Sequence, residues 1–183
     1  MSDASSVERR LSWLMDKEEI REVIYRYARG IDRLQYDLVR SCYHPDGTDD
    51  HGDYRGGIDG FIEYITSGLG AWERTMHFMG NCLIEPNGDM ARAETYALTY
   101  HRVSARGDKP ALDFLGAVRY LDDFEKRNGE WKILSRVCLV DWTRTDAVAA
   151  RGWRRPDDYT QPHRGLEDPV FADVLRDIHL RQR

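Results

Sequence analysis

The sequence lacks the features that mark membrane, secreted and nucleic-acid-binding proteins. No apolar stretch approaches the roughly 20 residues that a membrane helix needs, and the opening MSDASSVERR has no apolar signal segment. The chain has 27 Lys and Arg against 32 Asp and Glu, a net charge of −5, and no basic run longer than two residues. We therefore expect a cytoplasmic protein that binds neither membranes nor nucleic acids.

Cysteine is also scarce. Cys42, Cys82 and Cys138 stand at wide spacings without a CxxC pair, which predicts reduced, buried thiols rather than disulfides or a zinc site. The chain contains no GxGxxG, P-loop, GxSxG or SxxK motif, so the common nucleotide and nucleophile signatures are missing. We accordingly expect no cofactor and no bound metal.

The size and composition predict one folded domain with a tail. The chain has 183 residues, of which 41% are hydrophobic and 11% aromatic, and a chain of this size buries about 70% of its surface without disulfides. We place the domain at 1–145. Residues 146–183, with their scattered Gly and Pro, are expected to form an extended arm with a short helix near Val170–Leu180. Such an arm either wraps a neighbouring subunit, covers a pocket or hangs free.

The first part of the chain predicts helices. Asp16 is the expected N-cap of the first, and Gly30 is a possible bend, because glycine costs about 1 kcal/mol relative to Ala inside a helix. The segment Ser41–Gly57 reads as a loop with at most a short strand, and Ile58–Leu69 as a second helix ended by Gly68 or Gly70. The first helix is marked by apolar residues at three- and four-residue steps, namely Ile20, Ile24, Tyr27, Ile31 and Leu34.

The second part predicts four strands at 75–85, 90–104, 111–125 and 130–142. Asn87-Gly88 and Asn128-Gly129 join the first and last pairs, and Asn-Gly favours a hairpin turn because both residues accept φ > 0. Helices followed by an antiparallel meander give an α+β fold, in which a curved sheet packs on the helices and encloses a cavity. The other face of the sheet could meet a second subunit.

Two residues of this layout are candidates for catalysis. Asp32 follows the apolar stripe of the first helix and so lies near the mouth of the cavity, although it could be an ordinary solvated carboxylate beside Arg33. His77 shares a strand face with Met79 and Asn81. It is either a core histidine satisfied by a backbone carbonyl or a functional group.

Other polar residues are open to two interpretations. Arg136 lies on an apolar strand face and must be paired or face a polar cavity; an ion pair with Asp113 or Glu94 is as plausible as substrate binding. Tyr27 lies on the helix stripe, where core packing is the default. A further cluster suggests a metal but fits no known spacing, so a polar loop explains it better; it contains His44, Asp46, Asp49, Asp50, His51 and Asp53.

The chain resembles the SnoaL-like branch of the NTF2-like superfamily, which has a cystatin-like α+β cone and includes scytalone dehydratase, bile-acid 7α-dehydratase and hexachlorocyclohexane dehydrochlorinase. The resemblance covers roughly residues 10–145. It rests on the helix EEIREVIYRYARGIDRLQYD, the loop CYHPDGTDDHGDYRG, the strand TMHFMGN and the strand WKILSRVCLVDW.

The resemblance implies roles for several residues. The family's catalytic Asp and His match Asp32 and His77, its polar residue five positions before the Asp matches Tyr27, and the Arg of its last strand matches Arg136. Scytalone dehydratase also uses a second histidine and a further tyrosine, and the resemblance implies His101 and either Tyr43 or Tyr54 in those places. Asn81, expected on the strand face of His77, is a further candidate for substrate binding.

The implied activity is a cofactor-independent elimination, most simply a dehydration, of a hydrophobic aromatic, polyketide or steroid-like molecule. One alternative is an aldehyde-releasing carbon–carbon lyase acting on a lignin-derived aromatic diol. Others are an isomerase and a non-catalytic binding or assembly module such as a dioxygenase β subunit. The resemblance also implies a homo-oligomer, with a trimer favoured over a dimer.

Overall fold

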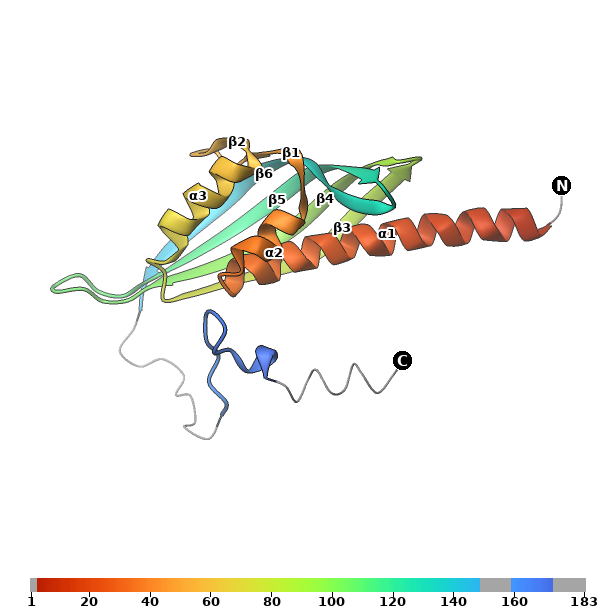
Figure 1. Ribbon diagram of the computed structural model, residues 1–183. Helices are drawn as coiled ribbons and strands as arrows, with labels where there is room; N and C mark the ends of the chain where they lie inside the picture. The colour runs from red at the N-terminus through yellow and green to blue at the C-terminus, as the bar shows by residue number, and fades with distance from the viewer. Residues whose placement is uncertain (1–2, 149–158, 173–183) are drawn as a thin grey trace.

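The computed structural model describes residues 3–148 and 159–172. It has an α+β fold in which helices cover one face of a curved, open six-stranded sheet (Figure 1). The elements, in chain order, are α1 (Asp3–Asp32), α2 (Tyr36–Ser41), β1 (Tyr43–Asp50), β2 (Arg55–Gly57), α3 (Ile58–Leu69), β3 (Arg74–Asn87), β4 (Met90–Val103), β5 (Leu112–Arg127), β6 (Glu130–Ala147) and the 3₁₀ turn η1 (Pro169–Phe171). Within these ranges, no helix has the length and apolarity needed to cross a membrane.

The sheet has the strand order β2-β1-β6-β5-β4-β3. Strands β3 to β6 form the predicted antiparallel meander, and β1 pairs parallel to β6, so the complete sheet is mixed. The predicted turn at Asn128-Gly129 is confirmed by φ angles of 54° and 82°. The other turn is shifted by one residue, because Asn87 pairs with Met90 and leaves Gly88 and Asp89 as the turn residues.

The expectation of a loop over Ser41–Gly57 is wrong, since β1 is an eight-residue strand. Its inward positions include two polar residues, His44 and Asp49, which are 4% and 1% exposed. His44 Nε2 lies 2.8 Å from the Glu125 carbonyl oxygen, and Tyr43 donates a hydrogen bond to Asp49. A search for alternating apolar residues does not find β1, because its buried side chains are polar and form hydrogen bonds within the protein.

Helix α1 begins well before the predicted N-cap, so that interpretation of Asp16 is also wrong. Asp16 lies inside the helix, and its Oδ1 accepts hydrogen bonds from Lys126 Nζ and Trp131 Nε1, both at 2.9 Å. The carboxylate therefore fastens the helix to the β5–β6 hairpin. The predicted stripe is buried at Ile20, Ile24, Tyr27 and Ile31, whereas Leu34 lies beyond the helix with a φ of 55°.

Helix α1 lies against the concave face of the sheet (Figure 1), and its apolar stripe forms part of the core. The sheet curves where its strands are bulged, at Met79/Cys82 in β3 and at Ala117/Val118 and Asp123/Phe124 in the β5–β6 pairing. Helix α3 has the predicted bounds and buries Phe61, Ile62 and Ile65 on the same side. Space between the helices and the curved sheet remains for a cavity.

Gly30 does not break α1, which continues to Asp32. The glycine allows α2 to pack closely, because a Cβ at this position would lie 2.7 Å from Val39 Cγ2 and 3.2 Å from the Gln35 carbonyl oxygen. This contact holds the end of α1, and with it Asp32, against the rest of the domain.

We expect Gly30→Ala to lower the free energy of unfolding by about 1–3 kcal/mol, because overpacking outweighs the roughly 1 kcal/mol gain in helix propensity. Gly68→Ala is the matched control, since a Cβ at Gly68 meets nothing within 4 Å. Urea denaturation followed by circular dichroism measures both. A Gly30→Ala variant as stable as the control would show that the close packing is unimportant.

Candidate active site

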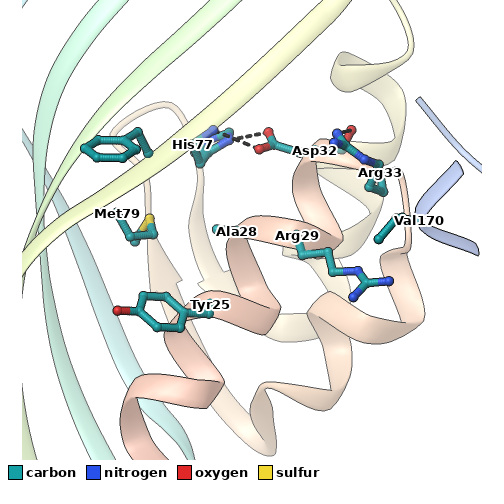
Figure 2. Close-up of a pocket in the computed structure, with 9 residues that line it drawn as sticks. Tyr25, Ala28, Arg29, Asp32, Arg33, His77, Met79 and Val170 are labelled. Atoms are coloured by element: carbon teal, nitrogen blue, oxygen red, sulfur yellow. Dashed lines mark hydrogen bonds and ion pairs between the residues drawn. The ribbon is translucent and has the colours of Figure 1, made fainter. Parts of the chain in front are cut away.

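The fold brings Asp32 and His77 into direct contact. Asp32 ends α1, and His77 lies near the start of β3, the strand that packs beside the helix (Figure 2). His77 Nδ1 lies 2.8 Å from Asp32 Oδ1, and the His77 backbone N–H donates to Asp32 Oδ2 at 2.8 Å. Thr75 Oγ1 donates to Oδ1 at 3.0 Å. Asp32 is thus a paired group rather than a freely solvated one.

The environment keeps Asp32 ionised. Burial alone would raise the pKa of the Asp32 carboxyl, but hydrogen bonds from the His77 ring and backbone and from Thr75, with the charge of His77, lower it below its ordinary value. A carboxylate opposite Nδ1 requires the proton of a neutral His77 to be on Nδ1. Nε2 then carries the free electron pair, and among the described residues it has no hydrogen-bond partner.

His77 lines a cavity of about 580 Å³ between α1, α3 and the concave face of the sheet. The cavity is mostly apolar and aromatic, and it is large enough for a ring-bearing small molecule. Its aromatic and imidazole lining consists of Tyr27, His51, Phe61, Tyr64, Trp72, His77, His101 and Tyr120. A smaller hollow of about 350 Å³ lies on the outer side of the Asp32–His77 pair, beside Tyr25, Arg29 and Arg33 (Figure 2).

His101, a predicted binding candidate, lies beside His77 in the cavity. The two imidazole rings are 5.4 Å apart in an edge-to-face arrangement, and Trp72 packs on His101 at 5.0 Å. Burial, and then repulsion from the charge that His77 carries whenever it is protonated, lower the pKa of His101 to about 4. His101 is therefore neutral at physiological pH and can offer a hydrogen bond without a charge.

Tyr27 lines the cavity, but Arg136 does not. Arg136 is 1% exposed and donates two hydrogen bonds of 2.7 Å to Asp122, with its guanidinium against the rings of Tyr27 at 4.1 Å and Tyr120 at 4.4 Å. The structure thus places it behind the cavity wall as a buried ion pair. Burial raises the pKa of Tyr27 well above its ordinary value, so the hydroxyl keeps its proton.

The ion partners suggested for Arg136 were wrong. Asp113 pairs with Arg102 and Glu94 pairs with Arg119. The register of the β5–β6 hairpin sets Asp122 directly opposite Arg136 instead.

Three other binding candidates lie off the cavity. Tyr43 is buried and donates to Asp49, while Tyr54 donates to the Gly57 carbonyl oxygen; the cavity wall includes neither. Asn81 was expected on the face of His77, and that expectation is wrong. The bulge after Met79 turns Asn81 to the exposed side and brings Cys82 inward, where its Sγ lies 3.0 Å from Thr95 Oγ1.

Sequence reasoning missed His51 as a cavity residue. His51 Nδ1 contacts the Asp49 carboxylate, and the ring faces the same cavity as His77. Asp49 and His51 are two positions apart, which places their side chains on one side of an extended chain. This spacing within the polar cluster was the sequence signal for the pair. Across residues 3–148 and 159–172, no group of three or more His, Cys, Asp and Glu side chains is arranged to hold a metal.

The described part of the predicted arm lies beside the end of α1 that carries Asp32. Arg164 Nη1 donates to the carbonyl oxygens of Leu69 and Trp72, both at 2.7 Å, and Arg33 pairs with Asp168 at 3.4 Å. Pro169–Phe171 forms a single 3₁₀ turn. The rest of the helix predicted near Val170–Leu180, from residue 173 onward, lies outside the described residues.

Comparison with known proteins gives a family match. A family model described as a SnoaL-like domain matches residues 13–137. Uncharacterized proteins from Mycobacterium tuberculosis and Mycobacterium bovis are 28% identical over 130 residues, covering 68% of this chain and 84% of the relatives.

Solved structures share the fold. A hexachlorocyclohexane dehydrochlorinase (LinA-type3) from Novosphingobium barchaimii has a TM-score of 0.67 at 18% identity, covering 80% of this chain and 99% of its own. A proposed scytalone dehydratase from Novosphingobium aromaticivorans has a TM-score of 0.63 at 18% identity, covering 81% and 97%. A Nostoc punctiforme protein of unknown function with a cystatin-like fold has a TM-score of 0.58 at 24% identity, covering 69% and 92%.

We expect the imidazole of His101 to titrate with a midpoint near 4, because burial and His77 disfavour its charged form. Between about pH 6.5, the ordinary pKa of histidine, and about pH 4, the unfolded chain binds a proton at His101 that the folded chain does not bind. Acidification through this range should therefore lower the free energy of unfolding. Ring-proton NMR against pH measures the midpoint, with the urea-unfolded chain as control. A folded-state midpoint at or above the unfolded one would contradict the assignment.

Proposed function

This chain belongs to the SnoaL-like family, and from that membership and the geometry of its cavity we propose that it is a cofactor-independent lyase that removes water from a hydrophobic, ring-bearing small molecule. The observation that carries the proposal is the Asp32–His77 pair, whose imidazole faces an aromatic cavity. A carboxylate on one imidazole nitrogen orients the other nitrogen as a base and stabilises the imidazolium that forms.

In this mechanism His77 Nε2 removes an acidic proton from a carbon next to a carbonyl or conjugated ring. General-base catalysis of this kind contributes about 10²–10⁴-fold to a rate. The Tyr27 hydroxyl, which keeps its proton, donates a hydrogen bond to the oxygen on which negative charge develops. The carbon–oxygen bond then breaks, and the departing hydroxide takes a proton to leave as water.

The size and lining of the cavity support an aromatic, polyketide or steroid-like substrate. Burying the flat rings of such a molecule against Phe61, Trp72 and Tyr120 stabilises the complex through apolar contact. The lyase class is also supported by the names of two structural neighbours, a dehydratase and a dehydrochlorinase, which both describe eliminations.

We expect His77→Gln and Asp32→Asn each to lower the rate of dehydration of an aryl β-hydroxyketone probe, 4-hydroxy-4-phenylbutan-2-one, by about 10²-fold or more. The measurement is the ultraviolet absorbance of the conjugated enone product. His44→Gln and Asp37→Asn are matched controls, because neither residue lines the cavity. Rates for both dyad variants within about threefold of wild type would remove the general-base assignment.

We also propose that the protein is a homo-oligomer, with a trimer favoured over a dimer, assembled through the outer face of the sheet. Phe78 of β3, Leu98 of β4 and Trp142 of β6 lie in one row across this face, with Ala117 of β5 between Leu98 and Trp142, and they are 60%, 50% and 50% exposed. A continuous exposed apolar patch of this kind marks an interaction surface. We propose a second copy of the chain as the partner, because the patch is apolar and consists of large side chains.

We expect sedimentation at micromolar concentration to show an oligomer, and Leu98→Glu to convert it to monomer, because the substitution sets a charge in the apolar contact. Leu166→Glu is the matched control, since Leu166 is 76% exposed and lies away from the sheet. A wild-type protein that sediments only as a monomer would contradict this assembly.

A further inference from the structure

A second imidazole–carboxylate pair faces the same cavity as Asp32 and His77. His51 follows the end of β1, and its Nδ1 contacts Asp49, which is 1% exposed. Tyr43 donates a hydrogen bond of 2.6 Å to the other oxygen of the same carboxylate. The arrangement matches that of His77: a buried carboxylate holds Nδ1, and a hydroxyl group holds the carboxylate.

The His51 ring is fixed in position by aromatic packing. It stacks on Phe61 at 5.0 Å and lies 5.9 Å from Tyr120, and all three rings line the cavity. Within the described parts of the chain, its Nε2 has no hydrogen-bond partner. One ring nitrogen is therefore held by the protein, and the other is available to a molecule in the cavity.

Packing alone does not account for this arrangement. A phenylalanine would fill the same stack without a buried carboxylate beside it, and burying a carboxylate is costly unless it is paired. Arg136 lies opposite Asp49 in the β1–β6 register, but its guanidinium donates hydrogen bonds to Asp122. The hydrogen-bond partners of the buried Asp49 carboxylate are Tyr43 and His51. A carboxylate in this position orients the imidazole and stabilises its charged form when that form arises.

Resting on the lyase function proposed above, we propose that His51 is a second catalytic residue, the acid that protonates the leaving oxygen, and that Asp49 is its positioning residue. The substrate class follows from this role. A hydroxyl leaving group needs a proton to depart as water, whereas a halide does not. The second pair thus suits a β-hydroxy carbonyl compound and distinguishes it from a β-halo analogue.

His77 Nε2 takes the proton of the carbon–hydrogen bond, and the electron pair of that bond forms the carbon–carbon double bond. The carbon–oxygen bond breaks with its pair on oxygen, and the proton of His51 Nε2 completes a water molecule. His77 has then gained one proton and His51 has lost one, and exchange with solvent restores both before the next turnover.

Three probes separate the acid from the base. The first is 4-hydroxy-4-phenylbutan-2-one, which loses water. The second is 4-chloro-4-phenylbutan-2-one, which loses chloride to give the same enone and is measured above its uncatalysed background. The third is 4-phenylbutan-2-one in heavy water, which has no leaving group and reports only the base through deuterium exchange next to the carbonyl.

We expect His51→Gln and His51→Phe to lower the loss of water by about 10²-fold or more while chloride loss and deuterium exchange stay within about threefold of wild type. His77→Gln should lower the enzymatic rate of all three reactions by about 10²-fold or more. His51→Phe preserves the aromatic stack, so a packing role predicts that this variant keeps the wild-type rate of water loss. His44→Gln is the matched control from β1, the strand that precedes His51, because His44 Nε2 contacts the Glu125 carbonyl oxygen outside the cavity.

Asp49→Asn provides an independent variant, because an amide can hold the wrong imidazole tautomer while keeping the side-chain shape. It should reproduce the selective loss of dehydration, and its melting curve by circular dichroism checks that it is folded. Equal losses with the hydroxy and chloro probes, or no loss with either, would overturn the role of His51. Absence of all three reactions in the wild-type protein would instead overturn the proposed lyase function, and the role of His51 with it.

Discussion

The carboxylate of Asp32 joins the main helix to the edge of the sheet, and the site is built on that junction. It accepts three hydrogen bonds, from the Thr75 hydroxyl, the His77 backbone and the His77 ring. The backbone bond fixes the strand, and the ring bond fixes the imidazole that the strand carries. Close packing of Gly30 on Val39 holds the helix end in place, so the scaffold sets the position of the reactive nitrogen before any ligand binds.

The interior of the cone divides into an apolar cavity and a charged layer behind it. Arg136 and Asp122 neutralise each other between two tyrosine rings, and Asp49 is held by Tyr43 and His51. Because these charges are paired, the cavity in front of them remains suited to an aromatic molecule. Two imidazoles with carboxylates behind them then line the same cavity.

Periodicity and turn chemistry predicted most of the fold. The bounds of α3, the four-strand meander and the Asn128-Gly129 turn follow from local rules, and the approach of Asp32 to His77 follows from the apolar stripe, the strand face and the family resemblance. The failures share a different cause. Strand β1 buries polar side chains, a bulge reverses the face of Asn81, and cross-strand register rather than spacing chooses Asp122 as the partner of Arg136. These features depend on contacts between distant segments, which a local pattern does not contain.

The proposed chemistry requires Asp32 to hold the proton of the neutral His77 ring on Nδ1, which leaves Nε2 free as the base. The ¹⁵N chemical shifts of the His77 ring measure this directly in the resting protein, with Asp32→Asn as the comparison. We expect a protonated Nδ1 and an unprotonated Nε2 in the neutral ring of the wild-type protein, and a change of tautomer in the variant. A neutral His77 with its proton on Nε2 in the wild-type protein would contradict this chemistry.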